Sequence, residues 1–337
     1  MKKLTTERGL EEYKVSPPSC LALLKRYKNN EIFPTGKKLE FSGVGGRDVY
    51  NISKPFFING EETIAGRVEA RHAQADSEIV FFREGKDRWS PIYGAPTFYM
   101  EDCRVVRIGS EIIVEGVEAY PRPSAKYPEN IEFQTVFYRG LDLSSLKKFA
   151  VGPELMKDII ITPLSNGHIG VFTRHLGAEN GRGKIGFIEL LNLKEINPKN
   201  LLKARIIQNQ FIPDEWGGAN DAHAFKNWVY VLGHIAYEDN QNAKHYYAMT
   251  FLYYINSHKA SEIKIIATRK NFLSGEAKTP EHEDIVFPSG LTWHRNNTAT
   301  LYVGLSDAES HSAELSSKKI GIANKPISYI FKNVAKS

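Results

Sequence analysis

The stretch Cys103-Arg-Val-Val-Arg-Ile-Gly-Ser-Glu-Ile-Ile-Val-Glu-Gly-Val-Glu118 carries the signal on which the fold prediction rests. An apolar run meets a polar turn at Gly109-Ser110 and returns as a second apolar run that ends in charged residues. Two β-branched segments joined by a short turn containing Gly are typical of an antiparallel hairpin. We therefore expect this stretch to form one hairpin of a β-rich fold.

The same shape occurs five times along the chain, at intervals of roughly 45 to 65 residues. The other four hairpins are expected at Lys54–Glu69, Ile159–His175, Ala222–His234 and Ser289–Asp307. Further strands are expected between them, at Ser77–Arg83, Phe133–Tyr138, Lys184–Leu190 and His245–Tyr253. Because one four-stranded propeller blade needs ~40–50 residues, the sequence predicts an all-β fold, a five-bladed β-propeller.

The domain organisation follows from this repeat. Residues 1–37 are predicted to be an N-terminal extension with one short helix at Ser19–Tyr27, capped by Ser19, and residues 38–337 a single propeller catalytic domain. Pairing of Lys319–Ala323 with Lys38–Ser42 would close the ring. The competing architecture is a pair of β-sandwich domains, but no linker rich in Pro, Gly or Ser supports a split.

Composition argues against several classes of function. The formal net charge is +5, and the basic residues are scattered rather than grouped, which disfavours nucleic acid as a partner. Two cysteines, Cys20 and Cys103, are too few for a disulfide framework. No run approaches the ~18 apolar residues of a membrane span, and the N-terminus lacks an apolar signal core. We expect a cytoplasmic protein that needs no metal and no organic cofactor.

An acidic pair, Glu101-Asp102, lies directly before the first-quoted hairpin and after the turn-rich segment Ile92–Thr97. Asp102 therefore falls where a loop enters a strand, a position from which a side chain can take part in chemistry. Asp is also common in turns for purely structural reasons. This position alone leaves both interpretations open.

Acidic and basic residues recur at the ends of the expected inner strands. Several carboxyls in one channel suit sugar hydroxyls and general acid catalysis, whereas Arg and Lys in the same mouth suit a phosphate. Each charge taken singly is as readily explained as a solvated strand end. The acidic set is Asp48, Glu69, Asp102, Asp221, Asp284 and Asp307. The basic set is Arg47, Arg67, Arg104, Lys157, Arg174, His223 and His234.

Short elements in this order resemble a known family. They are Gly46–Ser53, Gly66–Glu69, Asp76-Ser77, Met100–Arg104, Met156–Asp158, Thr173-Arg174, Asn220–His223 and Glu283–Gly290. The chain resembles the mannosyltransferase/phosphorylase family that turns over β-1,2-linked mannose oligosaccharides, formerly known only as a domain of unknown function. It is more distantly similar to the five-bladed β-mannoside phosphorylases. Glu101-Asp102-Cys103-Arg104 resembles their Glu-Asp-Pro-Arg motif, with Cys103 in place of Pro.

The resemblance implies an inverting phosphorolysis in which Asp102 is the general acid. The Asp protonates the leaving oxygen through a sugar hydroxyl while inorganic phosphate, the co-substrate, attacks from the opposite face. Phosphate needs positive charge to hold it, for which we expect Lys157, Arg174 and His234, with His223 and Arg104 in reserve. Mannosyl hydroxyls would be held by Asp48, Asn51, Arg67, Asp221 and Asp284. The same site could run in synthesis, from mannose 1-phosphate or a nucleotide-linked mannose.

Aromatic residues and histidines complete the expected site. Trp216, taken as loop-borne, is the expected platform for a sugar ring, and Tyr120 is placed on the acceptor side. Trp228 and Trp293 lie within hairpins and are expected in the core. His72, His168, His175 and His282 are expected to be surface or loop residues without a role in binding.

Two other classes of function remain open from the sequence. A hydrolase on the same fold would release a sugar with water, and would need a second carboxylate as base. A non-catalytic propeller would bind carbohydrate or protein, because a fold does not determine a function. The mixture of acids and cations expected in one mouth favours an enzyme.

Overall fold

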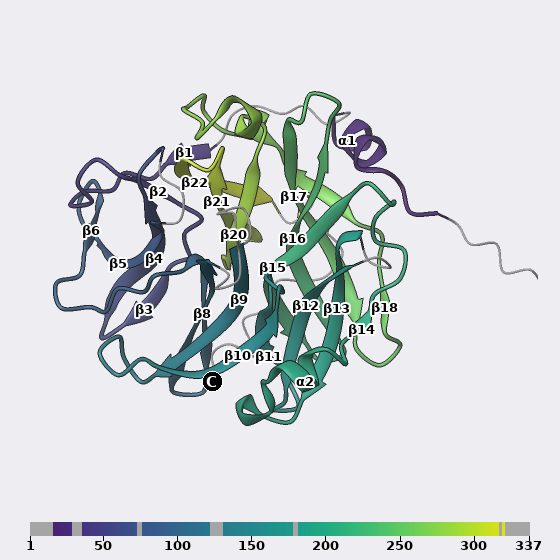
Figure 1. Ribbon diagram of the computed structural model, residues 1–337, viewed down its shortest axis with the longest axis horizontal. Helices are drawn as coiled ribbons and strands as arrows, with labels where there is room; N and C mark the ends of the chain where they lie inside the picture. Colours follow the sequence, from purple (N-terminus) through teal and green to yellow (C-terminus); the bar gives the residue numbers. More distant parts are fainter. Residues whose placement is uncertain are drawn as a thin grey trace, which may run out of the picture.

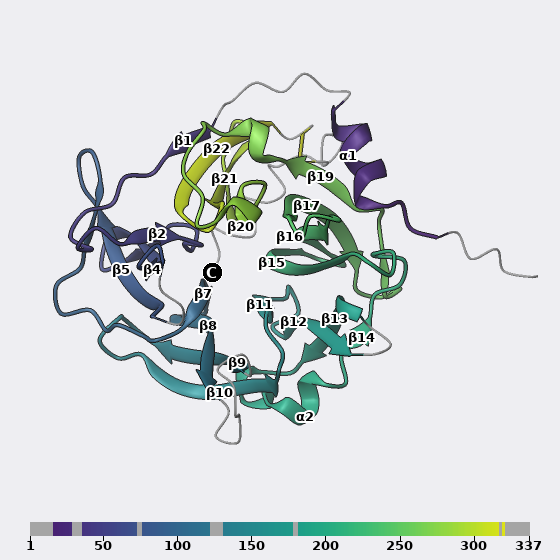
Figure 2. The ribbon, with the colours of Figure 1, turned by 45° about the horizontal axis from the view of Figure 1, so that its top comes forward.

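Five antiparallel sheets, one for each predicted hairpin, are arranged around a common axis (Figures 1 and 2). This computed structural model describes residues 16–28, 36–72, 76–121, 131–177, 181–316 and 319–320. The prediction of an all-β, five-bladed propeller with a short N-terminal helix is confirmed. Within the described residues no helix is both long and apolar enough to cross a bilayer.

Each blade is a meander whose first strand lies nearest the axis, as Figure 2 shows. Blade 1 contains β2 (Asp48–Tyr50), β3 (Phe56–Ile58), β4 (Glu61–Glu69), β5 (Glu78–Glu84) and β6 (Trp89–Pro91). Blade 2 contains β7 (Glu101–Ile108), β8 (Glu111–Pro121), β9 (Ile131–Gly140) and β10 (Lys147–Glu154). Blade 3 contains β11 (Ile160–Pro163), β12 (Ile169–Gly177), β13 (Gly181–Leu190) and β14 (Arg205–Ile206).

The last two blades complete the ring. Blade 4 contains β15 (Trp216–Phe225), β16 (Trp228–Glu238), β17 (Lys244–Tyr254), β18 (Lys259–Ala260) and β19 (Lys264–Ala267). Blade 5 contains β20 (Val286–Trp293), β21 (Thr298–Leu305), β22 (Glu309–Ser316) and β1 (Gly36–Lys38). The helical elements are α1 (Cys20–Lys28), α2 (Pro198–Leu201) and the single 3-10 turns η1 (Leu193–Glu195), η2 (Arg269–Asn271) and η3 (Pro280–His282).

The ring is closed by β1, which supplies the outer strand of blade 5. It pairs with β22, with Lys38 opposite His311, and Lys38 Nζ also contacts Glu309 Oε1 at 2.8 Å. The predicted closing strand at Lys319–Ala323 is wrong in its described part, because Lys319 and Ile320 form a turn, while residues 321–323 lie outside the described residues. This pairing joins the N-terminal part of the chain to the last blade by backbone hydrogen bonds.

The N-terminal helix packs against the outside of blade 4 rather than standing apart. Ser19 Oγ accepts a hydrogen bond from the Ala22 N–H at 3.2 Å, which confirms the predicted cap. Tyr27 donates its hydroxyl to Asn271 Oδ1 at 2.7 Å. Leu23 and Leu24 are buried in the same cluster as residues of β16 and β19.

The inner strands are irregular near the axis. Register shifts interrupt β7 between Glu101 and Arg104 and β20 between Pro288 and Gly290. In blade 1 the inner edge is split, because β2 and β3 pair with different parts of β4. Bulges of this kind redirect side chains away from the regular alternation of a strand. They decide which residues point into the channel.

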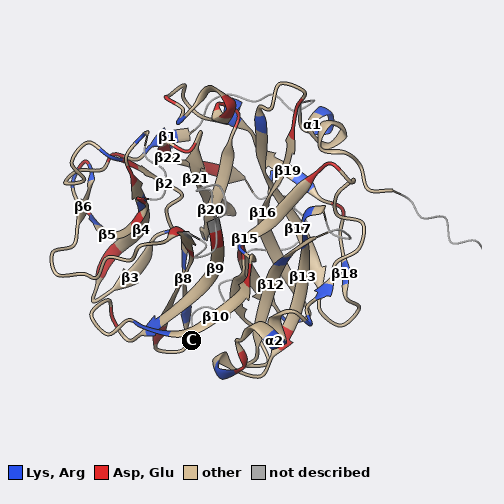
Figure 3. Ribbon diagram, viewed as in Figure 1, with Lys and Arg blue, Asp and Glu red and all other residues tan. Residues whose placement is uncertain are grey.

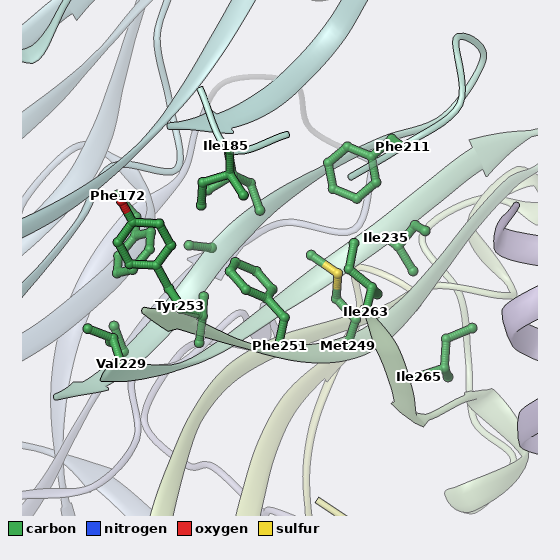
Figure 4. Close-up of a cluster of buried hydrophobic side chains, with 14 of the residues drawn as sticks. Phe172, Ile185, Phe211, Val229, Ile235, Met249, Phe251, Tyr253, Ile263 and Ile265 are labelled. Carbon is green, nitrogen blue, oxygen red and sulfur yellow. The ribbon is translucent and has the colours of Figure 1, made fainter. Parts of the chain in front are cut away.

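Apolar side chains fill the spaces between neighbouring blades, and Figure 4 shows the cluster between blades 3 and 4. Phe172 is 0% exposed and its ring centroid lies 4.9 Å from that of Phe187 and 5.8 Å from that of Tyr253. These two blades therefore stabilise one another through aromatic and aliphatic packing.

Replacement of Phe172 by Ala is expected to lower the free energy of unfolding by about 3–5 kcal/mol, because it removes a fully buried ring and leaves a cavity between two blades. Chemical denaturation measures the change. Phe57→Ala is the matched control, since Phe57 is 64% exposed and its loss should cost under ~1 kcal/mol. Equal losses in the two variants would contradict this account of blade packing.

Candidate active site

A cavity of about 250 Å³ lies where the five blades meet, and every blade contributes to its wall. All of the lining residues carry polar or charged side chains except Ile285 and Phe287. A volume slightly below the ~300–1,000 Å³ of most ligand pockets suits a small, polar ligand. The lining residues are Asn51, Arg67, Glu101, Asp102, Lys157, Asp158, Arg174, His234, Lys244, Tyr246, His282, Ile285, Phe287 and Asp307.

Charges of both signs meet in this cavity. Arg67, Lys157, Arg174 and Lys244 face four carboxyl side chains, whereas Lys and Arg are otherwise interspersed with Asp and Glu over all the blades (Figure 3). The four carboxyl side chains are those of Glu101, Asp102, Asp158 and Asp307.

Asp102 is held in place by groups from blade 1. Its Oδ1 accepts hydrogen bonds from Asn51 Nδ2 at 2.7 Å and from Arg67 Nη1 at 3.3 Å. Both Asp102 and Asn51 have positive φ angles, 50° and 45°. Asp102 lies in the bulge of β7 and Asn51 in the break after β2, so both irregularities serve to bring these two side chains together.

Arg67, on β4, links the carboxyl groups on this side of the cavity. Its Nη2 lies 3.0 Å from Glu69 Oε2 and 3.3 Å from Glu101 Oε1. Glu69 is itself bonded to the Tyr50 hydroxyl and lies 2.8 Å from Lys278 Nζ. The guanidinium is thereby fixed by a buried network, and Asp102 is fixed through it.

The neighbouring carboxyls differ in their affinity for protons. Burial would raise the pKa of Asp102, but Arg67, Lys157 and Arg104 outweigh it and hold that pKa below its ordinary value. Burial raises the pKa of Glu101 above its ordinary value, despite the opposing effect of Arg67. Separation of the pKa values of neighbouring carboxyls is a common feature of acid–base sites.

Two positively charged side chains, Lys157 and Arg174, line another part of the cavity wall. Arg174 Nη1 donates to Asp158 Oδ2 at 2.8 Å, and its Nη2 donates to the Arg182 carbonyl at 2.6 Å. Lys157 Nζ makes no ion pair with any residue that the structure describes, and lies 5.8 Å from the centre of the Phe133 ring. An unpaired lysine in a polar cavity is suited to binding an anion.

His234 joins this group as a neutral side chain. It is 1% exposed, its Nδ1 lies 2.8 Å from Asn220 Oδ1, and its ring stacks on Tyr246. Burial lowers the pKa of His234 to about 3, with only a partial offset from Asp158. In the ligand-free site this lowered pKa leaves the ring of His234 neutral near neutral pH, so it is a hydrogen-bonding group there rather than the positive charge expected from the sequence.

Six of the predicted site residues are brought together in this cavity. They are Asn51, Arg67, Asp102, Lys157, Arg174 and His234. Arg104 lies just beneath it: its Nε donates to the Asn220 carbonyl at 2.8 Å and its Nη1 donates to the Asp102 carbonyl at 2.5 Å. Arg104 therefore supports the backbone of Asp102 instead of lining the wall of the cavity.

The other predicted residues are engaged elsewhere. Asp221 forms a separate network, at 2.8 Å from Lys54 Nζ and 2.9 Å from His223 Nε2. Asp48 pairs with Arg71. Asp284 accepts from the Tyr247 hydroxyl at 2.6 Å and lies 2.7 Å from His245 Nδ1. Their carboxylates are satisfied by these partners, and none of them lines the cavity.

The two aromatic candidates also lie away from the cavity wall. Trp216 begins β15 instead of lying on a loop, is 1% exposed, and packs under Arg182, whose Cζ lies 3.5 Å from the ring centre. Such burial leaves no free face for a sugar, so the prediction of an open platform is wrong. Tyr120 lies near the end of β8. Trp228 and Trp293 pack against the core, as expected.

Seven lining residues were missed by the site prediction, whereas Asp307, one of the acids expected at the ends of the inner strands, does line the cavity. His282, expected to be a surface or loop residue, lies in the turn η3 and lines the cavity with its Nε2 at 3.8 Å from Asp307 Oδ2. Glu101 and Asp158 each adjoin a predicted residue, and that adjacency was the available signal. The remaining residues, Lys244, Tyr246, Ile285 and Phe287, come from strand ends and turns where the sequence gives no orientation.

Residues 25–317 match the model of a protein family described as "Protein of unknown function (DUF1861)". The chain belongs to this family. No curated protein matches the sequence. The DUF1861 chain is 31% identical to MPT-4, a mannose phosphorylase from Leishmania mexicana whose structure was determined in complex with phosphate ion; the match covers 90% of this chain and 92% of that one, with a TM-score of 0.79.

Two further structures resemble this DUF1861 protein. MPT-1, a GDP-Man-dependent mannosyltransferase from Leishmania mexicana, is 28% identical over 88% of this chain and 94% of its own, with a TM-score of 0.79. The β-1,2-mannobiose phosphorylase from Listeria innocua shares the fold at 15% identity, over 86% and 93% of the two chains, with a TM-score of 0.58. In the part of the chain that the structure describes, no group of three or more His, Cys, Asp or Glu residues could hold a metal ion.

Replacement of Arg174 by Ala is expected to lower the free energy of unfolding by about 3–5 kcal/mol, because it leaves the buried carboxylate of Asp158 without its ion-pair partner. Arg26→Ala is the matched control, since Arg26 pairs with Glu262 on the surface and should cost at most about 1 kcal/mol. Denaturant unfolding of both variants makes the comparison. A loss in Arg174→Ala no larger than in the control would contradict the view of the pair as buried and tightly coupled.

Proposed function

We propose that this protein is an inverting phosphorylase of β-1,2-linked mannose oligosaccharides. It would release mannose 1-phosphate with inorganic phosphate as its only co-substrate, and would run in reverse as a mannosyltransferase. The observation that carries the proposal is the presence of Asp102 and of the cations Lys157 and Arg174 in one small polar cavity. The similarity of 90% of the chain to a mannose phosphorylase also supports this proposal.

The chemistry requires one acid and one anion site. A phosphate oxygen forms a bond to the anomeric carbon while the glycosidic carbon–oxygen bond breaks. The departing oxygen takes up a proton that Asp102 delivers through a sugar hydroxyl. Phosphate is already a competent nucleophile, so no carboxylate base is needed to activate it, and the protein's task is to hold it in line.

The low pKa of Asp102 in the ligand-free site is compatible with this role. A general acid must carry a proton, whereas Arg67 and Lys157 favour the ionised form. A phosphate bound beside Lys157 offsets that positive charge, and an added negative charge raises the pKa of a nearby carboxyl. Protonation of Asp102 is thus coupled to occupation of the phosphate site, which favours turnover only when the nucleophile is present.

Asp102→Asn should lower kcat/KM for phosphorolysis of β-1,2-mannobiose by about 10²–10⁴-fold, since the amide keeps the shape but supplies no acid. Mannose 1-phosphate formation measures the loss. Asp87→Asn is the control: Asp87 is exposed in the bend between β5 and β6, and its replacement should leave the rate unchanged. Full activity in Asp102→Asn would remove Asp102 from the mechanism.

Lys157→Met should raise the KM for phosphate by about 10–150-fold, the equivalent of one lost charge-assisted hydrogen bond worth about 1.5–3 kcal/mol. The KM for the disaccharide should change far less. Initial rates at varied phosphate and saturating disaccharide separate the two effects. A uniform fall in kcat with an unchanged phosphate KM would show that Lys157 does not bind the nucleophile.

Hydrolysis is a second candidate, favoured by one observation. Glu101 and Asp307 are further carboxyls in the same cavity, and burial raises the pKa of each, so either could serve as a base for water. Release of free mannose at the same rate with and without phosphate would support a hydrolase. No turnover of any mannoside, with or without phosphate, would support a carbohydrate-binding propeller.

A further inference from the structure

A carboxylate lies inside the expected anion site. The side chain of Asp158 is 3% exposed yet lines the same cavity as Lys157 and His234. Its Oδ2 accepts a hydrogen bond from Arg174 Nη1 at 2.8 Å and lies 4.0 Å from His234 Nε2. No hydrogen bond to Oδ1 occurs within the residues that the structure describes. A negative group in this position needs an explanation, because like charges repel most strongly where water is excluded.

The position of Asp158 is built into the backbone. Its φ angle is 55°, in the left-handed region that few non-glycine residues adopt and in which Asp and Asn are the most common of them. Gly218 of the neighbouring β15 makes room for it: a Cβ at Gly218 would lie 2.8 Å from Asp158 Oδ2 and 3.0 Å from its Cβ. The left-handed backbone at Asp158 and the absence of a side chain at Gly218 thus place this carboxylate against Arg174.

Asp158 is ionised at neutral pH. Burial opposes the charge, but Arg174 and the other cations nearby lower the pKa of Asp158 to about 2. An ionised carboxylate only accepts hydrogen bonds. It therefore repels an anion whose oxygens carry no proton, and it binds one whose oxygen carries a proton that it can donate.

We propose that Asp158 accepts a hydrogen bond from a protonated oxygen of bound phosphate, and that this contact makes the cavity select phosphate over sulfate. The inference rests on the proposed phosphate-dependent function and identifies the residue that sets its anion specificity. At neutral pH inorganic phosphate and arsenate each carry at least one proton, whereas sulfate of the same shape carries none. Lys157 and Arg174 contact the unprotonated oxygens of the phosphate, and Asp158 accepts the hydrogen bond from its protonated oxygen.

A purely structural role makes a different prediction. If Asp158 only orients Arg174, then Asp158→Asn weakens the binding of phosphate and sulfate by the same factor. If Asp158 instead accepts a hydrogen bond from the ligand's protonated oxygen, the Asn side chain of the variant, which can donate a hydrogen bond, relieves the repulsion of sulfate. The ratio of the phosphate and sulfate affinities then changes. The ratio is therefore the informative quantity.

The test is calorimetric titration of the wild-type protein and of Asp158→Asn with sodium phosphate, arsenate and sulfate. The wild type should bind phosphate and arsenate at least tenfold more tightly than sulfate, and Asp158→Asn should reduce this preference at least tenfold. Asp307→Asn, which changes a carboxyl of the same cavity whose near partner is His282, should keep the wild-type ratio. Equal binding of phosphate and sulfate by the wild type, or an unchanged ratio in Asp158→Asn, overturns the proposal.

A second measurement uses the wild type alone and so does not depend on a variant that folds. Mannose 1-phosphate loses its last proton near pH ~6, so its affinity should fall by about tenfold per pH unit above that value. The groups that face Asp158 are Lys157, Arg174, Arg104 and His234, and sulfate affinity over the same pH range reports any titration of these groups. An affinity for mannose 1-phosphate that follows that of sulfate at every pH overturns the proposal.

The two proposals fail separately. Selective binding of phosphate without phosphorolysis would remove the proposed function and leave the anion specificity in place. If the protein catalyses phosphorolysis but sulfate inhibits it with the same affinity as that of phosphate, the proposed function stands and the proposed role of Asp158 is excluded.

Discussion

Closure of the ring by β1 is the constraint on which the rest of the structure depends. Because β1 pairs with β22, backbone hydrogen bonds tie the first part of the chain to the last blade, and the five inner strands are held around one axis. The cavity exists only in the closed ring, since each blade supplies part of its wall. Blade packing of the kind made by Phe172 and Tyr253 is therefore a condition for the site as well as for stability.

Within the ring, charge balance explains how so many ionisable groups share a small space. Four cationic side chains meet four carboxyls, and the strongest contacts pair opposite signs, as in Arg67 with Asp102 and Arg174 with Asp158. Lys157 is left without an ion pair among the described residues. A neutral sugar can form hydrogen bonds with the paired groups, and an anion can balance the positive charge of Lys157.

The sequence predicted the fold well because the fold depends on patterns that are local. Each of the five hairpins was visible as two apolar runs around a turn, and all five are antiparallel pairs in the structure. Closure was misplaced because it joins distant segments, and very short strands such as β1, with three residues, give almost no periodic signal.

The site was predicted only in part, for a different physical reason. Asp102, Lys157 and Arg174 were found from short motifs, but side-chain direction depends on bulges and positive φ angles that no alternation pattern reveals. Asp221 and Asp284 were misplaced because each has a partner close in space but distant in sequence, Lys54 and Tyr247 respectively. Asp158 and Asp307 enter the cavity from positive φ angles of 55° and 51°.

The central claim is that phosphate, held beside Lys157 and Arg174, attacks a β-mannoside on the face away from the departing oxygen. Proton NMR of the sugar phosphate formed from β-1,2-mannobiose and inorganic phosphate tests it most directly, because the anomeric configuration records the face of attack. The account predicts α-mannose 1-phosphate as the product. Formation of the β-anomer, or of free mannose as the main product while phosphate is present, would contradict it.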